Sequence, residues 1–261
     1  MSTDRPSRRV ALWMRRHTRK HPRQVGLLAI AIVVGCSPQS GVSEDLRSGP
    51  IPPLRLSLAL EPRRAELESA VRGTRARIEA FAGRCGWQEL VGESFMDSVA
   101  IFGRKEEFDH ALLTIAGMDT GTALPATYCA ALENRVLLAV SPELYAENYP
   151  QGIEDRAYEK LLAHEISHRL HLRILGGNEE AMGPIWFFEG FATYAAGQFE
   201  TPTTPIDTSE VWAIVRSEER SDYRRYASAF RFFAARCSLR DLIDHAGRED
   251  FADWLRHSVA Q

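Results

Sequence analysis

The chain has 261 residues, 44% of them hydrophobic, which is enough to bury one core or one core with a small subdomain. Its formal charge of −3 hides an asymmetry, because residues 1–35 carry eight basic residues and one acid. Of 32 basic and 35 acidic residues, 24 and 34 lie beyond that segment, so the remainder carries a charge of −10. Such a domain is a poor partner for nucleic acid or anionic lipid, and we expect no nucleic-acid partner.

An apolar run, VGLLAIAIVVG at 25–35, follows the basic N-terminus. Its eleven residues are too few to span a bilayer but suit the hydrophobic part of a secretory signal. The run leads into Cys36, and the sequence VVGC resembles a bacterial lipobox. This resemblance implies removal of 1–35, a lipid on Cys36, and a place in the bacterial cell envelope on the periplasmic or extracellular face. A plain secretory signal is the alternative, and a start at Met14 would shorten the signal.

Residues 36–53 are rich in Ser, Pro and Gly and hold too few apolar residues to fold, which predicts a flexible tether. The folded domain is therefore expected at 54–261. Three further cysteines lie in it: Cys85, Cys129 and Cys237. In an oxidising compartment they allow one disulfide and one free thiol, with three possible pairings.

The periodicity of apolar residues predicts a helix at 61–82, a short strand at 97–103 and a helix at 104–117. Two strand-like pieces follow within 127–140, on either side of a turn at Glu133 and Asn134. After Ser141 the patterns are almost entirely helical. Helices are predicted at 142–149, 153–177, 184–199, 209–219, 222–236 and from Leu239 onward, and the long one stops at a Gly pair. A part with a sheet followed by a helical part is the α+β order.

The long predicted helix carries HEISH at 164–168. On a helix, His164 and His168 differ by about 40° in direction and lie about 6 Å apart along the axis, so both imidazoles can reach one Zn²⁺. Glu165 points about 60° away from His168, beside such a metal, where a carboxylate can take a proton from metal-bound water. The pattern H-E-x-x-H is a metalloprotease signature. A coincidental match in a purely structural domain is the alternative.

Catalytic zinc takes three protein ligands, so a third must lie elsewhere. His171 is about 10 Å along the helix from His164, which is too far for one metal, and we interpret it as a second-shell or rim residue. Glu189 lies on the next predicted helix, which can fold back across the Gly-containing loop between them. Glu179 and Glu180 in that loop are rival ligands, although such a pair is more typical of solvated surface.

HEISH followed after twenty residues by EGFATY is similar to the gluzincin zinc peptidases, and EGFATY is especially similar to their aminopeptidase N branch. The resemblance implies a thermolysin-like gluzincin fold, with a small mixed sheet whose edge strand lies over the cleft and the HEISH helix on the cleft floor. It also implies that a helical lobe supplies Glu189 as the third ligand. Phe188 departs from the Asn common before that glutamate, and Thr193 stands where thermolysin-like enzymes use an acid to brace a histidine.

Two further resemblances concern the substrate. DYRRYASAFRFF has Tyr223 at the position of the family's tyrosine, whose hydroxyl stabilises the oxyanion, and Tyr226 where glycine is common. Core aromatics are the alternative. AALEN at 130–134 resembles the Gly-Ala-Met-Glu-Asn stretch that holds the substrate amine in aminopeptidases, which implies that Glu133 and Asn134 bind substrate. Their alternative is a simple turn before a strand.

These patterns predict a membrane-anchored zinc peptidase that binds one Zn²⁺ per chain and hydrolyses a peptide or protein substrate. An endopeptidase is favoured over an aminopeptidase, because only about a hundred folded residues precede HEISH and leave little material to close the far end of the cleft. A catalytically silent zinc-binding surface lipoprotein is the remaining alternative. The presence of both Glu165 and a tyrosine speaks against it.

Overall fold

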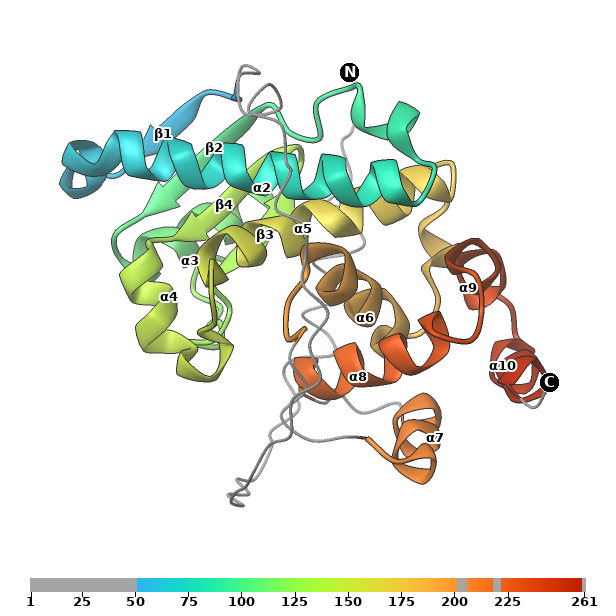
Figure 1. Cartoon of the computed structure of the whole chain (residues 1–261). Coiled ribbons are helices and arrows are strands. Elements are labelled where there is room, and N and C mark those ends of the chain that lie inside the picture. The colour runs from blue at the N-terminus through green and yellow to red at the C-terminus, as the bar shows by residue number, and fades with distance from the viewer. Residues whose placement is uncertain (1–50, 201–205, 218–221, 260–261) are drawn as a thin grey trace, which may run out of the picture.

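The computed structural model describes residues 51–200, 206–217 and 222–259 (Figure 1). The predicted signal, Cys36 and the tether as far as residue 50 lie outside these residues. The first element, strand β1, begins at Leu54, where the folded domain was expected to start. Within the described ranges, no helix has both the length and the apolar character needed to cross a membrane.

Four strands form one small mixed sheet in the order β1-β2-β4-β3. They are β1 (Leu54–Leu56), β2 (Ser98–Phe102), β3 (Ala130–Glu133) and β4 (Val136–Val140). The first two and β4 run parallel, while β3 pairs antiparallel with β4 at the edge. This small mixed sheet, followed along the chain mostly by helices, confirms the predicted α+β class.

The turn between β3 and β4 lies one residue later than predicted. Glu133 is the last residue of β3 and pairs with Val136, so the turn consists of Asn134 and Arg135. Both have positive φ angles, 45° and 61°, as a two-residue hairpin turn of type I′ requires. Asn is one of the residues that accept this conformation most readily, which explains why the sequence predicted a turn that includes Asn134.

The helical elements of the described residues are η2 (Leu58–Arg63), α2 (Arg64–Arg84), η3 (Gln88–Val91), α3 (Lys105–Ile115), α4 (Pro142–Asn148), η4 (Pro150–Gly152), α5 (Ala157–Ile174), η5 (Glu179–Met182), α6 (Ile185–Ala196), α7 (Thr208–Arg216), α8 (Tyr223–Ala234), α9 (Leu239–Ala246) and α10 (Phe251–Val259). Each helix predicted from the sequence is present. The helix predicted at 61–82 begins as the 3-10 turn η2 before α2, and the tail beyond Leu239 forms two helices.

Side chains alternate between the two faces of the sheet, and each face has its own core. Val99 and Leu137 pack with α2 and α5, which run side by side across one face (Figure 1). Leu138 packs on the opposite face with Phe108 of α3 and Tyr145 of α4. The main core continues from α5 through α6 to α8, so α5 separates the sheet from the helical half of the molecule.

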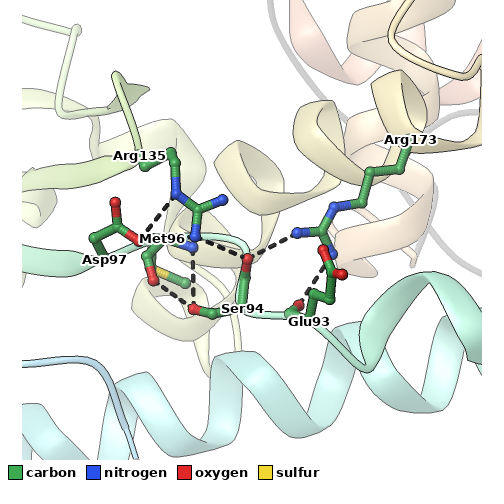
Figure 2. A network of polar contacts seen from close by, with 6 residues as sticks. All are labelled: Glu93, Ser94, Met96, Asp97, Arg135 and Arg173. Carbon is green, nitrogen blue, oxygen red and sulfur yellow. Dashed lines mark hydrogen bonds and ion pairs between the residues drawn. The ribbon is translucent and has the colours of Figure 1, made fainter.

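Two arginines fix the loop before β2 to the rest of the fold (Figure 2). Arg173, in the last turn of α5, donates to the backbone carbonyls of Glu93 at 3.0 Å and Ser94 at 2.7 Å. Arg135, in the β3–β4 turn, forms an ion pair with Asp97 at 2.7 Å and donates to the Ser94 carbonyl at 3.3 Å. The end of α5, the hairpin and the start of β2 are therefore held in one arrangement.

The three cysteines of the described residues, Cys85, Cys129 and Cys237, are free thiols. The disulfide that the sequence allowed among them is therefore not formed. Cys129 directly precedes β3 and is buried in the cluster that contains Phe108 of α3 and Tyr145 of α4, and burial raises the pKa of its thiol to about 11. A thiol with that pKa is almost wholly protonated at neutral pH and is a poor nucleophile.

Candidate metal centre

His164, His168 and Glu189 converge at the contact between α5 and α6. The two histidines lie one helical turn apart on α5, and Glu189 comes from the first half of α6. The Nε2 atom of His164 is 3.1 Å from Glu189 Oε2 and 3.2 Å from His168 Nε2, and His168 Nε2 is 3.5 Å from Glu189 Oε2. One ligand atom from each of these side chains lies within 4.8 Å of the other two.

The local sequence explains why the two helices meet here. α5 ends at a pair of glycines with φ angles of 60° and 89°, Gly176 and Gly177, which reverse the chain as predicted. Pro184 then precedes the first residue of α6, a position that suits a helix start. Because α6 packs along α5, Glu189 is brought to the face of α5 that carries both histidines.

This donor set fits a zinc ion. Two imidazoles and one carboxylate are the ligands of many catalytic zinc sites, with a fourth position left for water or substrate. Ligand atoms at about 2.1 Å from a tetrahedral ion lie about 3.4 Å from one another. The three separations of 3.1, 3.2 and 3.5 Å are close to that value. A carboxylate that is only 3% exposed also needs a cationic partner, and a metal ion provides one.

The protonation of His164 is linked to Glu189. Burial disfavours the charged imidazolium, but the hydrogen bond that the imidazolium donates to Glu189 and the negative charge of Glu189 outweigh burial and raise the pKa of His164. A proton and a metal ion stabilise the same carboxylate and use the same ring nitrogen. Binding of a metal therefore displaces a proton from this group of side chains.

The rival ligands lie elsewhere. Glu179 and Glu180 are exposed in η5 and do not belong to the converging group. His171 is outside this group as well, and of its two interpretations, second-shell or rim, the rim position is wrong because the residue is fully buried. It lies in the contact between α5 and α6, with its ring centroid 4.6 Å from that of Phe191 and 5.9 Å from that of Phe187. The hydrophobic core, not the cleft, accounts for its position.

Two predicted catalytic residues lie next to the ligands. Glu165 follows His164 on α5 and is half-buried. Tyr223 is the first residue of α8, and its ring meets the ring of His164 edge-on at a centroid distance of 5.5 Å. Tyr226 is instead buried in the core, 1% exposed. The structure therefore brings Tyr223 and not Tyr226 to the candidate metal centre, while Phe188 packs against the ring of His168.

Glu133 ends the edge strand β3 and Asn134 begins the turn after it, and neither is a member of the converging group. The pairing of Glu133 with Val136 puts it on the sheet face of Ala131, which packs with α3, α4 and the start of α5. Its side chain is buried, at 3% exposure. The Nδ2 group of Asn134 donates to the carbonyl of Ile115 at the end of α3, which anchors the hairpin turn.

The sequence patterns missed one residue of the site, Gln198. Its Oε1 atom lies 2.9 Å from Nδ1 of His164, and the residue is buried. Thr193, noted above as a departure from the pattern in which an acid braces a histidine, donates its hydroxyl to the carbonyl of Gly190 within α6. The only local signal for Gln198 is that a polar residue follows Gly197, the glycine that ends α6.

No protein-family model matches the chain, and no curated protein or solved structure matches it. The chemistry assigned to this site consequently depends on its own residues and their geometry.

Proposed function

We propose that this chain is a zinc-dependent peptidase of the gluzincin type, and that it is an endopeptidase and not an aminopeptidase. One observation carries the proposal: the ligand atoms of His164, His168 and Glu189 converge at the separations of a tetrahedral zinc site. Glu165 follows the first ligand directly on α5, which is where a proton acceptor for the reaction has to be. The mixed sheet with an antiparallel edge strand is also compatible with a gluzincin fold.

Each residue then has a separate task. Zn²⁺ held by the three ligands would supply Lewis acidity, which acidifies water and polarises a peptide carbonyl. Glu165 accepts the proton of the attacking water and delivers it to the leaving amine, since it is half-buried and carries no ligand role. The hydroxyl of Tyr223, whose ring contacts His164, donates a hydrogen bond to the oxyanion that develops on the substrate.

The position of Glu133 favours an endopeptidase over an aminopeptidase. To hold a substrate's free amine, this carboxylate would have to be reachable from the cleft. It is instead 3% exposed and belongs to the sheet face that α3 covers. We therefore expect cleavage of peptides with blocked N-termini. Cleavage of free-amine peptides alone, abolished by Glu133→Ala, would establish the aminopeptidase instead.

The test of the mechanism separates metal binding from proton transfer. Glu165→Gln should keep zinc, because Glu165 is not a ligand, and should lower the rate on blocked peptides by roughly 10²–10⁴-fold, since an amide cannot accept the proton. Glu180→Gln is the matched control, as Glu180 is exposed in η5, and should leave both quantities unchanged. Near-normal hydrolysis by Glu165→Gln with zinc bound would refute the role of Glu165.

We also propose that the mature protein is anchored to a bacterial envelope membrane by a lipid on Cys36. The support is the VVGC sequence after an eleven-residue apolar run. Mass spectrometry of the mature N-terminus should find residues 1–35 removed and a lipid-modified Cys36, and Cys36→Ser should release the protein from membranes. An unmodified, soluble mature chain would identify an ordinary secretory signal.

A further inference from the structure

We infer that Gln198 is a positioning residue of the metal centre, whose side-chain carbonyl orients His164 for the metal. This inference depends on the metal in the proposed function but not on the peptidase reaction. The Oε1 atom of Gln198 is 2.9 Å from His164 Nδ1, on the ring side opposite Nε2, and Nε2 faces Glu189 and His168. Since a carbonyl oxygen only accepts, Nδ1 keeps its proton, and Nε2 is the ring nitrogen that would offer its lone pair to a metal.

The end of α6 gives an independent argument. The N–H of Gln198 donates to the carbonyl of Thr193 at 2.9 Å, and that of Gly197 donates to the carbonyl of Tyr194 at 3.1 Å. With Gly197 at a φ of 68°, these two bonds form a Schellman motif. The position that Gln198 occupies in this motif usually carries an apolar residue that packs back on the helix. A glutamine buried there is unfavourable unless its polar atoms are bonded, so its contact with His164 explains the residue type.

The backbone around Gln198 is held from two sides. Phe199 has a φ of 53°, which is uncommon for a bulky residue and persists only where the surroundings enforce it. Its N–H donates to the carboxylate of Glu154 at 3.0 Å, and its carbonyl accepts from Arg231 of α8 at 2.9 Å. Arg231 also donates to the carbonyl of Gln198 at 2.5 Å. The strained turn therefore has a fixed position relative to α8.

The same turn is also fixed relative to α5. The carboxylate of Glu154 pairs at 3.2 Å with Lys160, a buried residue on α5 one turn before His164. Glu154 therefore connects the helix that carries the histidines to the backbone that carries Gln198. The backbone that carries Gln198 and the helix that carries His164 are both held in place. The hydrogen bond between the two side chains can therefore fix the direction of the imidazole ring.

The experiment measures zinc affinity by competition with a chromophoric chelator and the thermal unfolding midpoint of the metal-free protein. Gln198→Met keeps the side-chain length and suits the end of α6, so the metal-free protein should still fold, with an unfolding midpoint lowered only by the loss of one buried hydrogen bond. It should weaken zinc binding by about 10–100-fold, because it removes the acceptor for Nδ1–H. Gln198→Glu retains an acceptor of the same reach and should rescue affinity to within about threefold of the wild type. Gln151→Met, at an exposed position, is the matched control.

Gln198→Asn serves as a second test that does not depend on the folding of the methionine variant. Asparagine keeps the amide but is shorter by one methylene group, so its carbonyl falls short of the imidazole and zinc affinity should again decrease. Wild-type affinity in both the Met and the Asn variants would overturn the inference, as would a Glu variant as weak as the Met variant. A wild-type chain without zinc would instead overturn the proposed function.

Discussion

The two ring nitrogens of His164 have different partners, and this difference organises the site. Nε2 faces the carboxylate of Glu189 at 3.1 Å, and Nδ1 faces the amide oxygen of Gln198 at 2.9 Å. The ring of Tyr223 then covers the edge of the same imidazole. His164 thus contacts Glu189, Gln198 and Tyr223. Substitutions at these three residues should therefore change the environment of the metal that His164 is expected to bind.

We expect the hydroxyl of Tyr223 to act on the oxyanion of the substrate. Tyr223→Phe should lower kcat by roughly 10²–10³-fold, because it removes one oxyanion donor, while zinc content and KM stay near the wild type. Tyr226→Phe, on the same helix and in the core, is the control and should leave kcat almost unchanged. A kcat for Tyr223→Phe within about threefold of the wild type would exclude the hydroxyl from the reaction.

The relative positions of site residues could be predicted from the sequence where those residues share one helix. His164, His168 and Glu165 share one helix, so their relative directions follow from the helix geometry alone. Gln198 was out of reach of such an argument, because its contact with His164 depends on how α6 ends and on a turn held by Glu154 and Arg231. His171 shows another limit of helical spacing. The spacing placed His171 outside the ligand group, but it could not reveal the aromatic side chains of α6 that surround it.

At the scale of elements, the close contact of α6 with α8 determines where Glu189 lies. Gly190 follows Glu189 and sits directly against α8. A β-carbon added to Gly190 would lie 2.8 Å from Cβ of Phe230 and 3.0 Å from the carbonyl oxygen of Tyr226. The glycine of EGFATY is therefore required by helix packing, and its position beside the ligand makes that packing part of the metal centre.

Gly190→Ala should accordingly destabilise the protein by about 1–3 kcal/mol through overpacking, and should also weaken zinc binding because α6 must move. Gly83→Ala is the matched control, since Gly83 is exposed in α2 and its added β-carbon meets only the end of the Gln88 side chain. That control should stabilise the protein by up to about 1 kcal/mol through helix propensity. Urea unfolding measures the free energy of unfolding of both variants. Equal changes of the same sign in the two variants would contradict the close packing of Gly190 against α8.

The elements that the sequence predicted are the long ones with a clear period. The helices α5, α6 and α8 each bury one or more faces along several turns, and all three were found where the pattern indicated. β1 was missed because three residues show no period, and its strand pairing is with Val99–Ile101, far along the chain. The turn after β3 was misplaced by one residue, since strand pairing and not composition decides which residue ends a strand.

At the scale of the whole molecule, α5 is the element that both halves share. One side of it packs on the sheet with α2, and another side packs on α6, the first helix of the helical half (Figure 1). The arginines at its C-terminal end and in the β3–β4 turn hold the loop before β2 in place (Figure 2). The candidate metal ligands therefore lie on two helices whose relative position is set by the core, with no disulfide among the described cysteines.

Metal analysis of the purified chain tests most directly whether the three side chains bind zinc. The wild-type protein should contain one zinc ion per chain, because three ligands converge at tetrahedral spacing. Glu189→Ala removes one ligand and should lose most of that zinc, while Glu180→Ala, which changes an exposed residue of η5, should retain it. Full zinc occupancy in Glu189→Ala, or a wild-type chain that binds no zinc, would contradict zinc binding by His164, His168 and Glu189.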